Sequence, residues 1–195
     1  MCPRASRDLP DRGPLLRGPR TLTRLAADAD VDAVLRYWRD NGRRYDPPLP
    51  PHLLDRRHWL ERSRAARRDL EAGVSFKPYV FDPETHEVLG TVQITTIQPL
   101  PLSSCRLGYG IGGAREGQGY MQEAVRAVIG HVFGAMNLHR IEATYAPDNL
   151  RSARLLERLG FRREGVRERS FYSDGRWNDS VVTALLNEQW RPPDA

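Results

Sequence analysis

Apolar residues recur at helical spacing in the first third of the chain. After a short strand-like run that begins at Thr21, they fall on one face of a predicted helix at Ala33, Val34, Tyr37 and Trp38. The proline-rich segment 45–51 then interrupts regular structure, because proline fixes φ and has no N–H to donate. A second helix is predicted within residues 52–73. Its apolar face includes Leu53, Leu60 and Leu70, arginines occupy the opposite face, and Gly73 marks its end.

The middle of the chain changes to strand-like patterns. Residues 74–82 and 88–98 are rich in β-branched and aromatic residues, and the turn-forming segment between them predicts a hairpin. Residues 105–112 continue this meander as a third strand. From Tyr120 to about Met136 a helical face returns, formed by Met121, Ala124, Val125, Val128, Ile129 and Val132.

The C-terminal third alternates strand, helix and hairpin. Residues 138–145 are predicted as a strand and 149–161 as a helix, with Asn149 as its N-cap and Gly160 as its C-terminal cap. Between two further strand-like runs, the pair Asp174-Gly175 is a strong hairpin signal, because a type I′ turn needs positive φ at both positions.

These elements follow one another in the order β-α-α-β-β-β-α-β-α-β-β. A strand–helix–strand crossover among hairpins predicts an α/β fold with a central mixed sheet and helices on both faces. Residues 1–20 lack periodicity and are predicted to form a flexible leader. Residues 21–190 are then expected to form a single domain, followed by a tail of residues 191–195.

Composition narrows the function classes only a little. The formal net charge is +5, and Lys77 is the only lysine, so arginine carries nearly all the positive charge. This balance is compatible with an anionic cofactor, an acidic substrate or a nucleic-acid surface. Apolar runs stay well short of the roughly 20 residues that span a bilayer, so we expect no membrane association. No secretory signal is evident at the N-terminus, and a cytoplasmic protein is expected.

Neither the cysteines nor the histidines predict a metal site or a disulfide framework. Cys2 and Cys105 are expected to be free thiols without a functional role. The histidines are scattered without ligand spacing, so no metal is expected.

The glycine-rich stretch GGAREGQGYMQEAV, residues 112–125, is the strongest chemical signal. It leads from a predicted strand into a predicted helix, whose first N–H groups and dipole form a ready site for an anion. The stretch lacks the Gly-Lys-Ser/Thr of a nucleotide triphosphatase loop, and Gln122 stands where a dinucleotide motif has its last glycine. Taken alone, it predicts a phosphate cradle and a simple turn equally well.

Residues 107–161 resemble the acetyl-CoA-binding core of the GCN5-related N-acetyltransferases (GNAT). The matching stretches are LGYGIG, AREGQG, HRIEATY, PDNLRS and LLERLGF. The similarity extends over roughly residues 21–190, through YSDGRWNDSVVTALL and, more weakly, WRDN. Within the family, the chain is most similar to the branch of the ribosomal-protein-alanine acetyltransferases RimJ and RimL, and to RimJ in particular. The resemblance implies the GNAT fold and acetyl transfer from acetyl-CoA, as co-substrate, to a primary amine.

The resemblance also implies which residues bind acetyl-CoA. They are Tyr109, Gly110, Ile111, Ala114, Arg115, Glu116, Gly117, Gln118, Gly119, Tyr120, Asn149 and Ser152. The chain departs from the family pattern at Ala114, where Gln or Arg is usual, but there the backbone should matter more than the side chain. It departs again at Leu156, where many members have a tyrosine that protonates the leaving thiolate.

Two residues are candidates for catalysis. Ser152 matches a serine that lies near the sulfur in relatives, so its hydroxyl could donate to the thiolate; alternatively it only stabilises the first turn of its helix. Glu142 could serve as a general base, as could Glu116. A salt bridge between Glu142 and a neighbour such as Arg140 is the favoured alternative, because a buried carboxylate needs a partner.

The acceptor amine is left open by the sequence. Candidates for contacting it are Trp38, Tyr45, Tyr172 and Trp177, each with core packing as the alternative. A protein N-terminus of the ribosomal protein S5 type is the first hypothesis, with a possible contact to the ribosome. A small amine (a polyamine, amino acid or aminoglycoside) is the second, and a ribosome- or RNA-associated factor built on the same scaffold is the third. We expect a monomer or a homodimer.

Overall fold

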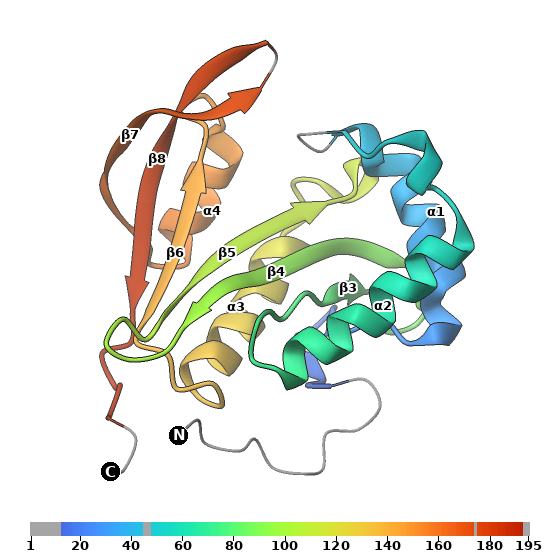
Figure 1. Cartoon of the computed structure of the whole chain (residues 1–195), viewed down its shortest axis with the longest axis horizontal. Coiled ribbons are helices and arrows are strands. Elements are labelled where there is room, and N and C mark those ends of the chain that lie inside the picture. The colour runs from blue at the N-terminus through green and yellow to red at the C-terminus, as the bar shows by residue number, and fades with distance from the viewer. Residues whose placement is uncertain (1–12, 45–47, 174, 193–195) are drawn as a thin grey trace. The chain divides into compact units, whose positions relative to one another are not determined.

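The computed structural model describes residues 13–44, 48–173 and 175–192. The chain divides into two compact units, Met1–Gln93 with Tyr109–Val128, and Ile94–Gly108 with Ile129–Ala195. Three elements have residues in both units, and they are β4 (Val88–Gln98), β5 (Ser104–Ile111) and α3 (Tyr120–Phe133) (Figure 1).

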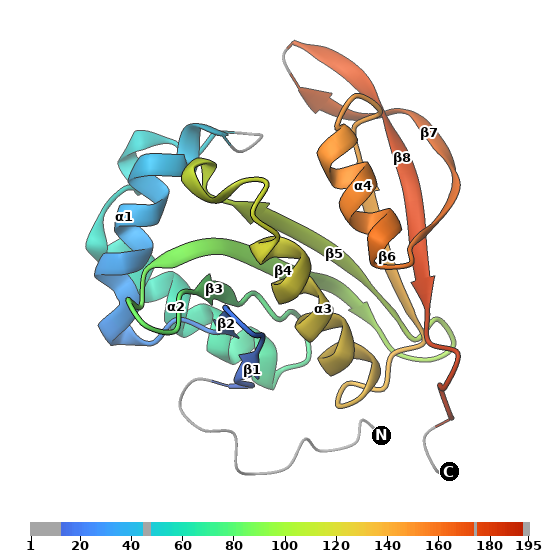
Figure 2. The same cartoon turned by 180° about the vertical axis from the view of Figure 1, so that it is seen from behind.

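The first unit is a strand meander with helices on its two faces. The elements that it adds are β1 (Leu16–Arg17), β2 (Leu22–Arg24), α1 (Val31–Asn41), α2 (Arg56–Glu71) and β3 (Tyr79–Phe81). Neighbouring strands from β1 to β4 pair antiparallel, and β5 follows β4. Helices α1 and α2 cover one face and α3 lies on the other, as the opposite views show (Figures 1 and 2).

A cluster of buried apolar side chains joins α1 and α2 to the strands. Its members are Leu22, Ala26, Val31, Val34, Leu35, Trp59 and Phe81. Both ends of α2 are closed by local hydrogen bonds. The Asp55 side chain accepts from the N–H groups of Arg57 and His58, and Gly73, at φ +68°, ends the helix. The predicted apolar face of α2 is only partly right, because Leu60 and Leu70 are half-buried while Trp59 is 2% exposed.

The face of α3 matches its prediction closely. Met121, Ala124, Val125, Val128 and Val132 are all buried, and Ile129 is half-buried. The helix packs tightly on β4, since a Cβ added at Gly90 would lie 2.8 Å from the terminal methyl group of Met121.

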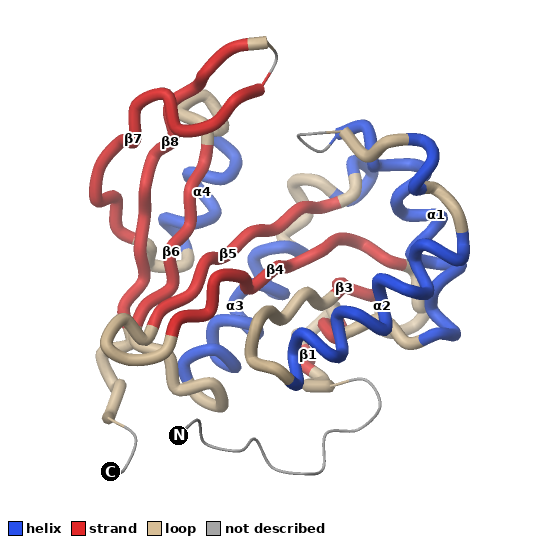
Figure 3. The backbone as a smooth tube through the Cα atoms, viewed as in Figure 1, coloured by secondary structure: helices blue, strands red, loops and turns tan. Residues whose placement is uncertain are grey.

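The second unit contains both parallel and antiparallel strand pairs. Its further elements are β6 (Arg140–Tyr145), α4 (Leu150–Arg158), β7 (Arg162–Ser173) and β8 (Arg176–Leu186). Its strands are the red segments of β6, β7 and β8 in Figure 3, together with part of β4 and β5. Strand β6 runs parallel to β5 and antiparallel to β8, which in turn pairs antiparallel with β7. The predicted mixed sheet is therefore confirmed. Ser173 pairs with Arg176 across the predicted hairpin turn, in which Gly175 has φ +75°, while Asp174 lies outside the described residues.

The flexible leader predicted for residues 1–20 needs correction where the structure describes it. Leu16 and Arg17 form β1, which pairs with β2 through a turn closed by the hydrogen bond from Gly18 N–H to Thr21 O at 2.9 Å. A short edge strand is held by backbone hydrogen bonds, so it needs no apolar periodicity. The signal that could have revealed it is the Gly18-Pro19 pair, because proline favours the second position of a turn. A single domain over residues 21–190 stays a prediction, as does a tail from residue 191.

A buried ion pair stabilises the start of α1. The Arg24 side chain is 2% exposed and donates to both carboxylate oxygens of Asp30, at 2.6 and 3.0 Å. Its guanidinium lies 4.1 Å from the centre of the Phe81 ring. The same carboxylate accepts from Ala27 N–H at 2.7 Å. The Asp30 side chain thus connects β2, through the buried Arg24 cation, to the turn before α1.

Asp30→Asn should therefore destabilise the protein strongly, because it leaves the Arg24 cation buried without a counter-charge. We expect the free energy of unfolding to fall by about 3–5 kcal/mol, measured by urea denaturation. Glu61→Gln is the matched control. It breaks the exposed pair of Glu61 with Arg57 and should change stability by less than about 1 kcal/mol. Equal effects of the two substitutions would contradict this account of Asp30.

Candidate functional site

The glycine stretch forms a loop between β5 and α3 in the first unit. After β5 ends at Ile111, a single 3-10 turn covers Gly113–Arg115, and α3 begins at Tyr120. Gly117 and Gly119 have φ of +73° and +84°, a conformation that other residues adopt only with strain. The glycines thus let the chain turn sharply into the helix without a Cβ above the loop.

The first half of this loop is held by hydrogen bonds from its surroundings. Gly112 N–H donates to Leu89 O at 2.8 Å, and Gly113 N–H donates to Asn41 Oδ1 at 3.0 Å. The Gln118 side chain donates to Ala114 O at 3.0 Å and closes the loop on itself.

The second half of the loop leaves donors free. Among the residues that the structure describes, no acceptor is found for the N–H groups of Gly117, Gln118 and Gly119. The first turn of α3 adds N–H groups that have no partner within the helix. Free donors at the positive end of a helix dipole suit an anion such as a pyrophosphate, so the loop fits the group that the resemblance implies.

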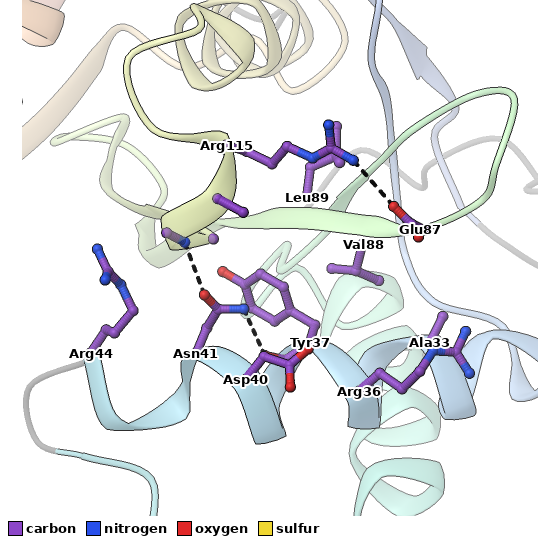
Figure 4. Close-up of a pocket in the computed structure, with 13 residues that line it drawn as sticks. Ala33, Arg36, Tyr37, Asp40, Asn41, Arg44, Glu87, Val88, Leu89 and Arg115 are labelled. Atoms are coloured by element: carbon purple, nitrogen blue, oxygen red, sulfur yellow. Dashed lines mark hydrogen bonds and ion pairs between the residues drawn. The ribbon is translucent and has the colours of Figure 1, made fainter.

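A pocket of about 550 Å³ lies beside the loop, within the first unit. It is bounded by α1, by the start of β4 and by the 3-10 turn of the loop (Figure 4). Asn41 lines the pocket where it meets the loop. Its side chain is oriented by a hydrogen bond to Tyr37 O at 3.0 Å. The charged side chains that line the pocket are Arg36, Asp40, Arg44, Glu87 and Arg115.

Ion pairs hold the acidic side chains near the loop. Arg44 donates to Glu116, and Arg115 lies 3.3 Å from Glu87. Glu116 is therefore paired with a cation. The part of β5 before the loop, Tyr109–Ile111, is half-buried, and Ala114 is exposed with its carbonyl bonded to Gln118. Their roles in binding acetyl-CoA stay predictions.

In the second unit, Asn149 and Ser152 form the start of α4. Asn149 Oδ1 accepts from Ser152 N–H at 3.1 Å, so the predicted N-cap is confirmed. The helix ends at Arg158, and the predicted cap, Gly160, follows it with φ +91°, while Phe161 N–H donates to Leu156 O at 3.0 Å. Leu156 is 1% exposed and packs in the core. It has no proton to give, so any acid must come from another residue.

Glu142 has the ion-pair partner that the sequence favoured. Arg140 Nε lies 3.0 Å from its carboxylate, and Arg167 lies 3.8 Å away. Arg140 also forms a two-pronged contact with Glu164, which lowers the pKa of Glu164. With its carboxylate engaged in this network, Glu142 is poorly placed to take a proton, and its role as a base stays a prediction.

The aromatic candidates for the acceptor site differ in their surroundings. Trp38 stacks on Trp59 with ring centres 5.1 Å apart, and its indole N–H donates to Tyr79 OH. This packing agrees with the alternative for Trp38, whose role at the acceptor site stays a prediction. Tyr172 and Trp177 face each other across the β7–β8 hairpin, with ring centres 5.7 Å apart, and each is 62% exposed. Tyr45 lies outside the described residues.

Cys105 is a buried thiol in β5. Desolvation, assisted by the negative charge of Glu142, raises its pKa to about 12. It is therefore protonated near neutral pH and is a poor nucleophile. Among the described residues, no cluster of acidic, histidine or cysteine side chains could hold a metal ion. In the same part of the chain, no helix is both long and apolar enough to cross a membrane.

The model of the acetyltransferase (GNAT) domain family matches residues 20–162. The chain belongs to the GNAT family. It is 34% identical to the [ribosomal protein uS5]-alanine N-acetyltransferase of Escherichia coli (strain K12), over 89% of this chain and 91% of that protein. It also resembles the crystal structure of ribosomal-protein-S5-alanine acetyltransferase from Vibrio fischeri. That likeness has a TM-score of 0.85 and 30% identity, and covers 91% of this chain and 99% of the other. A further similar structure is Mycobacterium smegmatis RimJ in complex with CoA-disulfide. It has a TM-score of 0.80 and 27% identity, and the match covers 92% of this chain and 89% of the other.

Family membership confirms the expected fold, enzyme class and co-substrate. The protein is an acetyl-CoA-dependent N-acetyltransferase of GNAT type. Sequence reasoning missed Arg20, Asn41 and Arg44, which contact the loop from the N-terminal segment, from α1 and from the 3-10 turn Gly42–Arg44 after it. Asn41 belongs to the quoted WRDN stretch, so the resemblance held a signal for it. Arg20 and Arg44 had none, because only the folded chain brings them to the loop.

Gly119→Ala should weaken CoA binding, because the left-handed conformation of Gly119 costs an alanine roughly 1–2 kcal/mol. We expect the dissociation constant of CoA, measured by calorimetry, to rise about tenfold as the loop relaxes. Gly130→Ala is the control. Gly130 lies within α3 with open space around it, so alanine should raise stability by up to about 1 kcal/mol and leave CoA binding unchanged. Unaltered CoA affinity in Gly119→Ala would contradict the role given to the loop.

Proposed function

We propose that this enzyme acetylates the N-terminal α-amino group of a ribosomal protein, of the S5-alanine type, in the cytoplasm. The observation that carries this proposal is the similarity to ribosomal protein S5-alanine acetyltransferases over nine-tenths of the chain, at 34% and 30% identity. The charges of the described pocket are consistent with it. Three arginines and two acidic side chains line this pocket. A small cationic amine would favour an acidic site, and the pocket is not acidic.

From the resemblance, we propose that the loop in the first unit and the start of α4 in the second unit each contact acetyl-CoA. The free N–H groups of residues 117–119 and the N-terminus of α3 would hold the pyrophosphate of CoA, and Asn149 would contact its pantetheine arm. Acetyl-CoA supplies the thioester whose acetyl group is transferred. A backbone N–H of the strand Tyr109–Ile111 would polarise the thioester carbonyl.

The acceptor reacts by direct attack. Its neutral nitrogen forms a bond to the carbonyl carbon, the bond from that carbon to sulfur breaks with the electron pair staying on sulfur, and the nitrogen loses a proton to water. An α-amino group has a pKa near 8, against about 10.4 for a lysine side chain, so a protein N-terminus is more readily neutral at physiological pH. Positioning can then provide much of the rate without a dedicated base. The Ser152 hydroxyl would donate to the departing sulfur.

The exposed ring pair of Tyr172 and Trp177 is the best candidate surface for the acceptor peptide. Two large aromatic side chains in solvent need an explanation, and rigid amphipathic rings of this kind are typical of peptide-contacting surfaces. Trp38 and Tyr45 stay predictions for the same role.

The acceptor class can be tested with peptides and small amines. We expect acetyl-CoA turnover with peptides that begin with alanine, and none when the same peptide carries a blocked N-terminus and an internal lysine. The rate with sub-saturating peptide should rise with pH up to about 8, as the α-amino group loses its proton. Release of CoA and mass spectrometry of the peptide give the measurement. Turnover of polyamines, amino acids or aminoglycosides alone would disprove the proposed acceptor, and ribosome binding without turnover would favour the scaffold hypothesis.

Ser152→Ala tests the proton donor. The substitution keeps the N–H that Asn149 caps, so the helix should be unaffected while the single-turnover rate falls about 100-fold. CoA affinity and the unfolding midpoint should stay at wild-type values. An acetyl thioester of a more acidic thiol should shrink the deficit, because its sulfur needs less help to leave. A rate equal to wild type would remove Ser152 from the mechanism.

A further inference from the structure

The N-terminal hairpin turn contacts the first turn of α3 directly, within the first unit. The Glu123 carboxylate accepts from Arg20 N–H at 2.5 Å, from Arg20 Nε at 3.3 Å and from the Thr21 hydroxyl at 2.9 Å. The approach is so close that a larger residue at position 18 would force the contacting side chains to shift. A Cβ added at Gly18 would lie 2.6 Å from a Glu123 oxygen and 2.5 Å from the Thr21 hydroxyl oxygen.

The Arg20 guanidinium also reaches the glycine loop itself. Its Nη2 donates to Gln118 O at 3.2 Å, and the group lies 4.6 Å from the centre of the Tyr120 ring. At Gly119 an added Cβ would lie 3.3 Å from the same Nη2. One side chain therefore contacts residues on both sides of Gly119, where the backbone turns into the helix.

The charge at this position needs compensation. A carboxylate in the first turn of a helix stabilises the helix dipole, but it also repels an anionic ligand that binds at the same end. Glu123 is 12% exposed by its side chain, so solvent screens it poorly. The Arg20 cation cancels this charge and is itself 52% exposed beside the loop.

We propose that Arg20 is a positioning residue for the co-substrate: it fixes the Gly117–Gly119 loop through Gln118 and neutralises Glu123, so that the N-terminus of α3 accepts a pyrophosphate. The segment 18–21 is thereby part of the acetyl-CoA site. This inference rests on the proposed role of the loop as the pyrophosphate site.

Arg20 variants test this in CoA binding and in steady-state kinetics. Arg20→Ala should raise the dissociation constant of CoA and the KM for acetyl-CoA about tenfold, with kcat at saturation within about twofold of wild type. Arg20→Lys should recover part of the affinity, because it keeps the charge but not the fork of donors. The double variant Arg20→Ala with Glu123→Gln should recover most of it, because the repelling carboxylate is gone. Arg17→Ala removes the same charge from the same hairpin at an exposed position and should bind CoA normally.

Amide hydrogen exchange without any ligand gives an independent readout. In Arg20→Ala the amides of residues 117–120 should exchange faster than in wild type, whereas Arg17→Ala should leave them unchanged. Wild-type CoA affinity in Arg20→Ala would overturn the inference, as would unchanged exchange in the loop. A double variant as weak as Arg20→Ala would overturn the neutralising role. If the wild-type protein fails to bind CoA, the proposed pyrophosphate site is wrong, and loop exchange alone then decides whether Arg20 holds the loop.

Discussion

The backbone N–H groups at the start of α3 set the central constraint on the first unit. In the proposed pyrophosphate site these groups must remain free to meet an anion, yet the loop that carries them must hold one shape, because a mobile loop would lose entropy on binding. The chain meets both demands by fixing the rest of the loop. Leu89 and Asn41 accept the N–H groups of Gly112 and Gly113, while Gly117 and Gly119 adopt conformations that a side chain would strain.

The charges around this loop follow from the same constraint. Each of three carboxylates that would otherwise repel an anion is matched by an arginine: Glu116 by Arg44, Glu87 by Arg115 and Glu123 by Arg20. An arginine can bind a carboxylate and a carbonyl at once, as Arg20 does, which a lysine does less well. Arginine far outnumbers lysine in this chain, and composition alone did not explain why. At these contacts the arginine side chains pair with the carboxylates near the loop.

The start of α4 in the second unit combines structural and chemical demands in a few residues. The Asn149 oxygen caps the helix through the backbone of Ser152, which leaves the Ser152 hydroxyl outside that bond. At the position of Leu156, many relatives instead have a tyrosine that acts as an acid. In this chain the leucine side chain is buried in the core. Glu142 is likewise tied to Arg140. These contacts agree with the proposed mechanism, in which positioning and an easily deprotonated acceptor replace strong acids and bases.

The sequence by itself determined most of the elements, though not β1, and the donor. Periodicity identified the buried face of α3, the residues at both ends of α4 followed local capping rules, and the combined motifs identified the GNAT family, because each of these depends on neighbours in the chain. Contacts between distant segments were decided only by the tertiary structure. Arg20 meets Glu123 across 103 positions, and Arg44 meets Glu116 across 72. No local pattern encodes such a pairing, because an exposed arginine and a partnered one look alike until the chain folds.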